Sequence, residues 1–195
     1  LEDLRRRHIF DHMEHRLKTG YATSGINGDV RSLHGFLGFL QDQGYVVPQT
    51  LLRIPGLKER QRLPKYLTDE QVRLLRDDFE ERVRTAFQAH QYRDALLDRA
   101  AFYLLWQGGL RLGEVEELRL EDLDLENRRL SIRHGKGLKD RTVYLTDTAI
   151  YALGVYLMKR GVGPSDHVFL YRNRALRKDL VRNRIKAAGQ RVGVK

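Results

Sequence analysis

Arg111 and Glu114 stand three residues apart in the segment Gly108-Gly-Leu-Arg-Leu-Gly-Glu114. On a helical turn, side chains at this spacing face each other. A guanidinium presents a fixed fork of donors that matches a phosphate, and a nearby carboxylate can hold that fork in one rotamer. The pair therefore suggests a phosphate-binding arginine with an orienting glutamate. On these residues alone, a surface ion pair of little energetic value is the simpler interpretation.

The charge of the chain indicates a polyanionic partner. Its 195 residues include 36 Lys and Arg against 26 Asp and Glu, which gives a formal charge of +10. Residues 1–63 carry 10 basic and 7 acidic side chains, residues 64–158 carry 15 and 17, and residues 159–195 carry 11 and 2. Most of the excess therefore lies at the C-terminal end. Nucleic acid is the most frequent partner of such a chain, although ribosomal and membrane-surface proteins share the signature.

Metal and thiol chemistry have little support in the sequence. His8, His12 and His15 are spaced so that three imidazoles could share one helix face and bind a metal ion. A helix surface, or polar residues facing a nucleic acid, explains them more simply, and we expect no metal and no cofactor. The chain has no cysteine, which excludes a thiol nucleophile, a disulfide scaffold and cysteine-based metal sites.

Hydrophobic periodicity predicts a mainly helical chain with a small antiparallel β-sheet, an α+β fold. The predicted helices cover residues 4–20, 33–44, 68–83, 94–107, 147–160 and 176–188, the last with a stop at Gly189. Thr68 to Gln71 has the residues of a capping box. The helix over 94–107 is apolar nearly all round, so it should be central, and Gly108-Gly109 should end it.

The strands are predicted from alternation of apolar and polar residues. Leu130 and Ile132 alternate with polar residues, as do Val143 and Leu145, on either side of a turn at residues 135–140. This pattern indicates a β-hairpin. Residues 168–170 form a further short strand candidate.

A proline-rich segment divides the chain. Pro48, Pro55 and Pro64 fall within seventeen residues, and the stretch 53–65 is polar and basic, which indicates a linker. We therefore expect one domain over residues 1–62, including the linker, and a second over residues 63–195. Two helices make a thin core for the first domain, so a further N-terminal helix is expected outside this sequence.

The segment from Gly109 to Asp124 resembles box I of the tyrosine recombinase, or phage integrase, family, whose pattern reads roughly T-G-L-R-x-x-E-x-x-x-L-x-x-x-D-x-D. The matching positions are Gly109, Leu110, Arg111, Glu114, Leu118, Asp122 and Asp124. Gly108 stands where the family commonly has threonine. Residues 133–145 resemble the G-K-G-x-K-x-R hairpin that carries the family's catalytic lysine. In this order the two segments indicate a lambda-integrase-like or Xer-like recombinase over essentially the whole chain.

The resemblance implies a SAM-like helical core-DNA-binding domain followed by a catalytic domain. Site-specific recombinases of this family cut one DNA strand with a tyrosine hydroxyl, leaving a 3′-phosphotyrosyl link and a free 5′-hydroxyl. Arg111 would stabilise the pentavalent phosphorane, Lys136 would donate a proton to the leaving 5′-oxygen, and Glu114 would orient Arg111. Gly135 and Gly137 would let the hairpin move Lys136 into position. A solvated turn lysine is the plainer alternative.

The later part of the family's active site has no match in this sequence. The family carries an H-x-x-R box, then a His or Trp, then the nucleophilic tyrosine. His90-Gln-Tyr-Arg93 precedes Arg111, so we interpret it as a coincidence, and His167 has no arginine three residues later. Tyr151 and Tyr156 lie on a predicted helix and are interpreted as packing residues. We therefore expect a chain truncated at both ends, with no nucleophile of its own and inactive alone, from an active parent recombinase.

The resemblance and the charge together imply contacts with double-stranded DNA. The expected contact residues are Lys58, Arg60, Arg62, Lys139, Arg141, Arg172, Arg174, Arg177 and Lys178. The family also implies a homotetramer on synapsed DNA sites and no small-molecule substrate. The longest apolar run, Ala100 to Trp106, has seven residues where a membrane span needs about 20. No signal segment opens the chain, so we expect a cytoplasmic protein of bacterial, archaeal or phage origin, without a membrane partner.

Two other functions stay open at this point. One is a non-catalytic DNA-binding or regulatory relative with the same fold. The other, less favoured, is a basic RNA-binding or ribosome-associated protein, which would give Arg111 and Lys136 no functional role.

Overall fold

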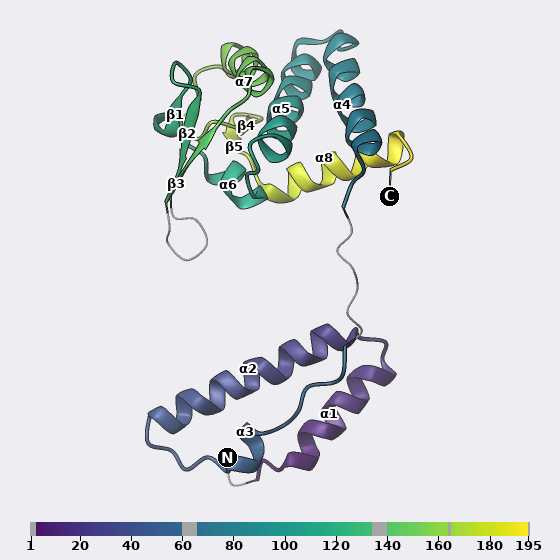
Figure 1. Ribbon diagram of the computed structural model, residues 1–195, viewed down its shortest axis with the longest axis vertical. Helices are drawn as coiled ribbons and strands as arrows, with labels where there is room; N and C mark the ends of the chain where they lie inside the picture. The colour runs from purple at the N-terminus through teal and green to yellow at the C-terminus, as the bar shows by residue number, and fades with distance from the viewer. Residues whose placement is uncertain (1–2, 60–65, 134–139, 164, 195) are drawn as a thin grey trace. The chain divides into compact units, whose positions relative to one another are not determined.

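The computed structural model describes residues 3–59, 66–133, 140–163 and 165–194, and the chain divides into two compact units, Leu1–Lys65 and Tyr66–Lys195. The predicted site residues Arg60, Arg62, Lys136 and Lys139 lie outside the described residues. Both units are built mainly from helices, and the second also holds short antiparallel strands (Figure 1), which confirms the predicted fold class. None of the described helices combines the length and hydropathy needed to cross a bilayer.

The first unit is a small helical core. It contains α1 (Arg6–Lys18), α2 (Thr23–Asp42) and the short α3 (Gln49–Leu52). Its buried apolar side chains are Ile9, Met13, Ile26, Val30, Leu37, Val47, Leu51 and Ile54. Gly20 follows α1 and Gly44 follows α2, both with a positive φ, so each of the first two predicted helices ends close to its predicted glycine.

Helix α2 begins ten residues before the predicted start at residue 33, because burial outweighs the cost of its glycines. Each glycine in a helix interior costs up to about 1 kcal/mol relative to alanine. Ile26 and Val30 extend the apolar stripe toward the N-terminus, with exposures of 0% and 5%. Burying two such side chains stabilises by about 3–6 kcal/mol. The early turns therefore stay helical although they contain Gly25 and Gly28.

Part of the predicted linker packs on the first unit. Ile54 is buried, and Leu57 lies against the same core. The side-chain amide of Asn27 donates to the Leu57 carbonyl at 2.9 Å, and its oxygen accepts from the Leu57 N–H at 2.7 Å. The interpretation of residues 53–65 as a linker is therefore wrong for 53–59, because an asparagine thirty residues away pairs with their backbone. Lys58 remains exposed on this segment.

The second unit packs its other helices around α5. Its helices are α4 (Asp69–Arg84), α5 (Ala89–Trp106), α6 (Leu112–Glu117), α7 (Asp147–Arg160) and α8 (Lys178–Arg191), with a single 3-10 turn η1 (Leu120–Asp122). Figure 1 shows α5 between α4 and α7, with α8 crossing below them. Every residue of α5 from Ala95 to Leu104 is buried, which confirms the predicted central position, although the helix starts five residues before residue 94. The buried stretch includes two charged side chains, Asp98 and Arg99.

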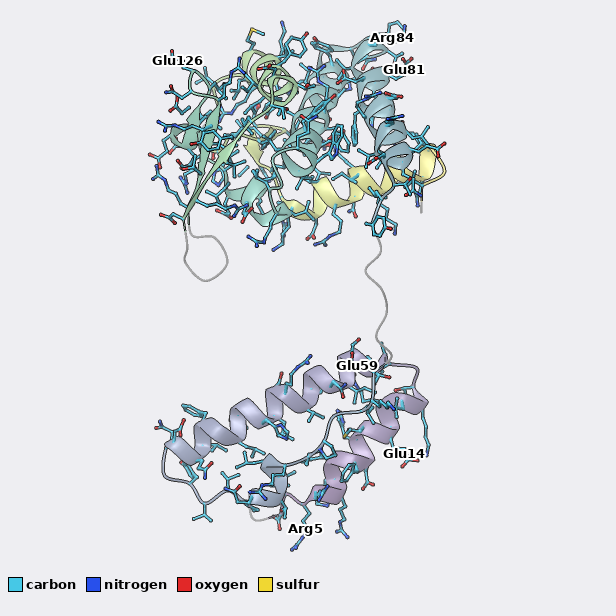
Figure 2. All side chains as sticks on the ribbon, viewed as in Figure 1. Arg5, Glu14, Glu59, Glu81, Arg84 and Glu126 are labelled. Carbon is cyan, nitrogen blue, oxygen red and sulfur yellow. The ribbon has the colours of Figure 1, made fainter. Side chains whose placement is uncertain are left out.

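The capping box predicted at the start of α4 is present in the structure. At α4, the Thr68 hydroxyl accepts from the Gln71 N–H at 3.2 Å, and the Gln71 side chain accepts from the Thr68 N–H at 3.0 Å. This is the predicted capping box. The outer side of α4 is charged, with Arg84 and Glu81 paired in solvent (Figure 2).

The predicted hairpin is confirmed and gains a third strand. Strands β1 (Leu123–Asp124), β2 (Arg129–Ile132) and β3 (Arg141–Tyr144) form one antiparallel sheet in the order β1-β2-β3. Leu130 pairs with Val143, and Ile132 pairs with Arg141. Leu130 and Ile132 are buried on one face, as the alternation predicts, and join the core around α5.

Three local predictions in the C-terminal part are wrong. The strand lies at β4 (Leu170–Tyr171), paired with β5 (Arg174–Ala175), because the tight turn between them sets the register. Helix α8 continues through Gly189 to Arg191, since this glycine is buried against the Val194 carbonyl. Tyr151 is 65% exposed and does not pack in the core, whereas Tyr156 on the same helix is fully buried.

Candidate functional site

Arg111 lies at the point where α5 ends and α6 begins. Gly109, with φ of +62°, turns the chain after α5. Arg111 then takes the N-cap position of α6, and its side chain is 60% exposed. It borders a cleft of about 710 Å³ between α6, η1 and β2. The other residues that line the cleft are Gly113, Glu114, Glu117, Leu118, Arg119, Glu121, Asp122, Ser131, Ile132 and Arg133.

Glu114 joins Arg111 to a strand of the sheet. Its carboxylate accepts the Arg111 N–H at 2.7 Å and the Arg111 Nη1 at 2.8 Å. It also accepts both terminal nitrogens of Arg141, each at 2.7 Å, in a bidentate pair. The Glu114 side chain is only 10% exposed. The predicted spacing of Arg111 and Glu114 therefore places the pair face to face, and Arg141 on β3 completes the group.

This arrangement keeps Glu114 ionised. The pKa of Glu114 is lowered to about 2, mainly by the hydrogen bonds from Arg141. The hydrogen bonds from the backbone and side chain of Arg111 add to this effect, and burial of the carboxylate opposes it. The same carboxylate raises the pKa of Arg141. Glu114 is therefore a fixed anion at any physiological pH and has no proton to exchange with a substrate.

A second arginine, Arg133, also lines the cleft, and the sequence analysis assigns it no role. Arg133 follows β2, and its Nε lies 2.8 Å from Asp122 while its Nη1 donates to Glu121 at 3.0 Å. Asp122, which is 7% exposed, also accepts the Arg119 N–H at 3.0 Å. The only sequence feature that pointed to this pair was the match of Asp122 to box I. Sequence spacing could not identify Arg133 as the partner of Asp122, because only the fold brings the two residues together.

The predicted DNA contacts differ in their surroundings. Arg172, Arg174, Arg177 and Lys178 are all exposed, around the β4–β5 turn and the start of α8. Arg141 instead donates to Glu114 and is 36% exposed. Whether any of these side chains contacts DNA stays a prediction.

Several other arginines of the C-terminal segment make hydrogen bonds and ion pairs that hold the second unit together. Arg160 is 7% exposed and donates to the backbone carbonyls of Gly161, Ser165, His167 and Val168, the last at 2.9 Å. Arg184 on α8 donates to Asp98 on α5 at 2.8 and 2.9 Å. Arg191 pairs with Asp78 on α4 at 2.6 Å. The positive excess of residues 159–195 is therefore smaller at the surface than the sequence count indicates.

None of the side chains that the structure places around the cleft is a tyrosine. Tyr156 accepts the Leu170 N–H at 2.8 Å, and burial raises its pKa to about 12. Tyr103 donates to Glu80, and burial followed by that carboxylate raises its pKa to about 12 as well. Both hydroxyls are held as protonated structural groups.

The histidines were considered as metal ligands and as members of an H-x-x-R box. His167 lies 2.7 Å from the Ser165 hydroxyl and 4.0 Å from Glu117, beside the strand-like pairing of His167 with Arg119. Among the residues that the structure describes, no group of three or more His, Asp or Glu side chains could hold a metal ion.

Comparison with known proteins supports the resemblance seen in the sequence. The model of the phage integrase family matches residues 65–195. The tyrosine recombinase XerA of Pyrococcus furiosus is 30% identical over 180 residues, which cover 90% of this chain and 57% of the relative. The tyrosine recombinase XerC of Pseudomonas syringae is 30% identical over 193 residues, covering 97% and 61%. The chain thus spans a little over half the length of the curated relatives it matches.

Solved structures share the fold at low sequence identity. A lambda integrase dimer bound to a core site superimposes with a TM-score of 0.75 at 15% identity, over 100% of this chain and 65% of the other. The XerH recombinase bound to its difH substrate gives 0.74 at 19% identity, over 100% and 55%. These likenesses establish the fold of the two units.

Proposed function

The chain belongs to the phage integrase family, and on this basis we propose that its second unit binds the reacting phosphate of DNA in a site-specific recombinase that cuts and rejoins strands. The observation that carries the proposal is the exposed guanidinium of Arg111, fixed by Glu114 beside a cleft. A guanidinium held in place before the substrate arrives stabilises negative charge without reorganising. Lys58, Arg60, Arg62, Lys139, Arg172, Arg174, Arg177 and Lys178 are proposed to contact the duplex backbone.

In this proposal Arg111 stabilises the charge that develops on the phosphate oxygens as the phosphorus becomes five-coordinate. The backbone N–H and Nη1 of Arg111 are committed to Glu114, and the side chain is 60% exposed, so the other guanidinium donors can reach a phosphate. Removal of one such preorganised donor commonly slows a reaction by about 10²–10³-fold. Lys136 is proposed as the acid that protonates the leaving 5′-oxygen, so that the strand leaves as a neutral hydroxyl.

Arg141 is better explained as a positioning residue than as a DNA contact. It starts β3, opposite Ile132 at the end of β2, so Lys136 belongs to the segment that joins these two paired residues. Its bidentate pair with Glu114 fastens that end of the sheet to Arg111. We infer that Glu114 and Arg141 together fix the distance between Arg111 and the base of the hairpin.

The nucleophile is proposed to come from outside this chain. The described tyrosines provide none beside Arg111, and the family requires a tyrosine to form the 3′-phosphotyrosyl link. A homotetramer on synapsed double-stranded DNA and a cytoplasmic location are proposed for the parent protein. The DNA-bound complexes among the structural neighbours support the DNA partner.

The experiment has two steps. First, the full 195-residue chain is used to select bound duplexes from a randomised pool, and the selected duplex is compared with the matching RNA by fluorescence anisotropy. Second, the selected sequence is built into a nicked suicide duplex and incubated with the chain and with Arg111→Ala. We expect duplex DNA to be bound more tightly than RNA, a weaker salt dependence for Arg111→Ala, and no covalent adduct.

Two results would contradict the proposal. Tighter binding of RNA, unaffected by Arg111→Ala, would favour the RNA-binding alternative. A covalent protein–DNA adduct formed by these 195 residues would show that the chain contains its own nucleophile. A matched control is Arg76→Ala, an exposed arginine on α4 that pairs with its neighbour Asp77 and lies outside the cleft.

A further inference from the structure

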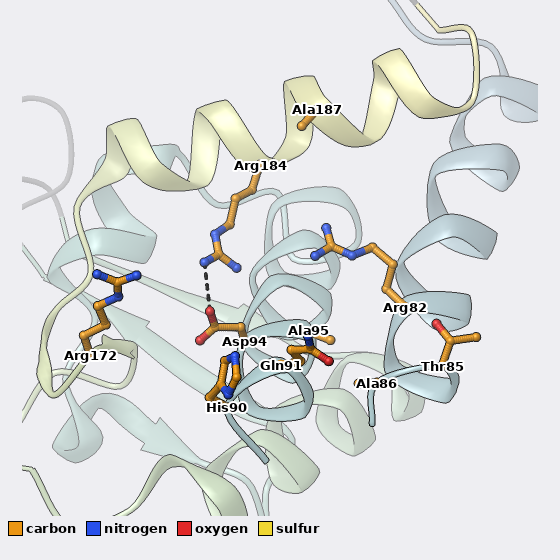
Figure 3. Close-up of a pocket in the computed structure, with 10 residues that line it drawn as sticks. All are labelled: Arg82, Thr85, Ala86, His90, Gln91, Asp94, Ala95, Arg172, Arg184 and Ala187. Atoms are coloured by element: carbon orange, nitrogen blue, oxygen red, sulfur yellow. Dashed lines mark hydrogen bonds and ion pairs between the residues drawn. The ribbon is translucent and has the colours of Figure 1, made fainter. Parts of the chain in front are cut away.

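A second basic pocket lies in the same unit, away from the cleft at Arg111. It has a volume of about 500 Å³ and is enclosed by the end of α4, the first turns of α5, the β4–β5 turn and the middle of α8. Three arginines from three different segments line it, and Figure 3 shows Arg172 and Arg82 on either side of Arg184. His90 and Asp94 form the wall contributed by α5.

Arg184 is held rigidly at the pocket wall. Its Nη1 donates to both oxygens of Asp98 at 2.8 and 2.9 Å, and its Nη2 donates to Asp94 at 3.2 Å. Its side chain is 18% exposed, and its guanidinium lies 4.8 Å from the centre of the Tyr171 ring. Because three hydrogen bonds and a ring fix this group, its position costs little further entropy when an anion binds.

Arg172 reaches the pocket from a turn that arginine rarely occupies. Arg172 and Asn173 have φ of +50° and +63°, the backbone of a turn in which Asn and Gly are preferred. The Arg172 guanidinium lies 5.2 Å from the Tyr171 ring. Within the part of the chain that the structure describes, it has no carboxylate within ion-pair distance. A strained position that aims an unpaired cation into a pocket is a reason to look for an anion there.

The charges at the pocket leave room for one anion. Arg82, Arg172 and Arg184 contribute three positive charges, and Asp94 and the buried Asp98 contribute two negative charges. Asp98 neutralises Arg184 and, at 3.9 Å, the nearer side of Arg82. One positive charge remains, centred on Arg172.

We propose that this pocket binds a phosphate group, held by Arg172 with support from Arg82 and the fixed Arg184. A tetrahedral anion can accept forked donors from several directions, which suits three guanidinium groups on separate walls better than it suits a planar carboxylate. The phosphate can come from a free phosphate ion or from a nucleic acid backbone. The proposal concerns a surface other than the Arg111 cleft and does not depend on strand cleavage, although a nucleic acid source of the phosphate rests on the duplex contact already proposed for Arg172.

The test is a titration of the full chain with inorganic phosphate at constant ionic strength, followed in ¹H–¹⁵N correlation spectra. Backbone signals of residues 90–95 and 171–174 should shift together and saturate, whereas matched additions of chloride should leave them unmoved. Arg172→Asn removes the guanidinium and suits the positive φ of the turn. It should weaken phosphate binding at least about tenfold, with no loss of stability.

The control is Arg174→Asn, which makes the same change in charge on the same hairpin but does not line the pocket. It should change phosphate affinity less than twofold. Equal losses for the two variants, or shifts that chloride reproduces, would overturn the proposal. A titration repeated with duplex DNA present identifies the source. Displacement of phosphate by DNA assigns the pocket to the nucleic acid backbone, and simultaneous binding assigns it to free phosphate.

Discussion

Replacing Glu114 by glutamine should loosen the group that fixes Arg111. The substitution keeps the size of the side chain and removes its charge. The carboxylate accepts four hydrogen bonds, from the Arg111 N–H and Nη1 and from both terminal nitrogens of Arg141. An amide has one acceptor oxygen, and its NH₂ group would face guanidinium donors. The bidentate pair with Arg141 cannot form, so both arginines lose their common anchor.

The size of the effect follows from the pKa of Glu114. The pKa lies at about 2 in the folded chain against an ordinary value of 4.5. One pKa unit corresponds to about 1.4 kcal/mol, so the ionised form contributes at most about 3 kcal/mol at neutral pH. Arg111 is 60% exposed and Arg141 is 36% exposed, so solvent screens part of the interaction. We expect Glu114→Gln to lower the free energy of unfolding by about 1–3 kcal/mol at pH 7.

The pH dependence has a definite sign. A carboxyl whose pKa is lowered by folding stabilises the folded state fully above its unfolded pKa, and this contribution is lost as the pH falls toward the folded pKa. The difference between the wild-type chain and Glu114→Gln should therefore be constant from pH 5 to 8. It should shrink between about pH 4.5 and pH 2, where the wild-type chain loses its advantage.

The single tryptophan makes the measurement specific. Trp106 lies at the end of α5, in the second unit, so urea unfolding followed by its fluorescence reports on that unit. Glu117→Gln is the matched control on the same helix, because Glu117 is 73% exposed and has only a distant histidine partner. If the two variants are equally stable at pH 7, or if the difference persists unchanged at pH 3, the proposed role of Glu114 is wrong.

Two further stability predictions use the same fluorescence assay, each with a control that makes the same type of substitution nearby in the sequence. Tyr156→Phe should cost about 1–3 kcal/mol, because the buried Leu170 N–H loses its acceptor, while Tyr151→Phe should change stability by less than about 0.5 kcal/mol. Gly108→Ala should cost about 1–3 kcal/mol, since its Cβ would meet a backbone oxygen at 2.7 Å, whereas Gly113→Ala meets nothing within 4 Å and should be neutral or stabilising. Equal effects within either pair would contradict the packing argument.

Short-range chemistry was the part of the fold that the sequence predicted best. The capping box at Thr68 and the pairing of the strands on either side of residues 135–140 depend on residues close together in the sequence, and both are confirmed. Helix α2 was predicted too short, because glycine propensity was weighed without the burial of Ile26 and Val30. Burial depends on the packing of the whole unit, which periodicity alone does not supply.

In the candidate site too, the contact between residues close in sequence was predictable and the contact between distant residues was not. Arg111 and Glu114 could be paired from their spacing of three residues, and the structure brings them together. Arg141 lies 27 residues from Glu114 and was predicted as a DNA contact, as the last residue of the G-K-G-x-K-x-R motif. Only the register of β2 with β3 brings its guanidinium to the carboxylate. A sequence pattern can identify charged residues in a motif, but the pairing between motifs is a property of the sheet.

Counting basic residues in the C-terminal segment overestimates the positive charge that is free at the surface, because some of these residues are paired within the fold. Arg184 and Arg191 use their charge to join α8 to α5 and α4, through Asp98 and Asp78. Burial raises the pKa of Asp98 to about 6 in spite of Arg184, so this ion pair is formed at a cost that the packing of α8 must offset. Neutralising Arg191 therefore removes the ion-pair partner of Asp78, and neutralising Arg184 leaves the buried Asp98 with only the more distant Arg82 at 3.9 Å among the described residues. Substituting an exposed basic residue such as Lys178 changes the electrostatic potential at the surface without breaking an ion pair inside the fold. A loss of polyanion affinity in such a variant can therefore be attributed to the lost contact and not to a damaged fold.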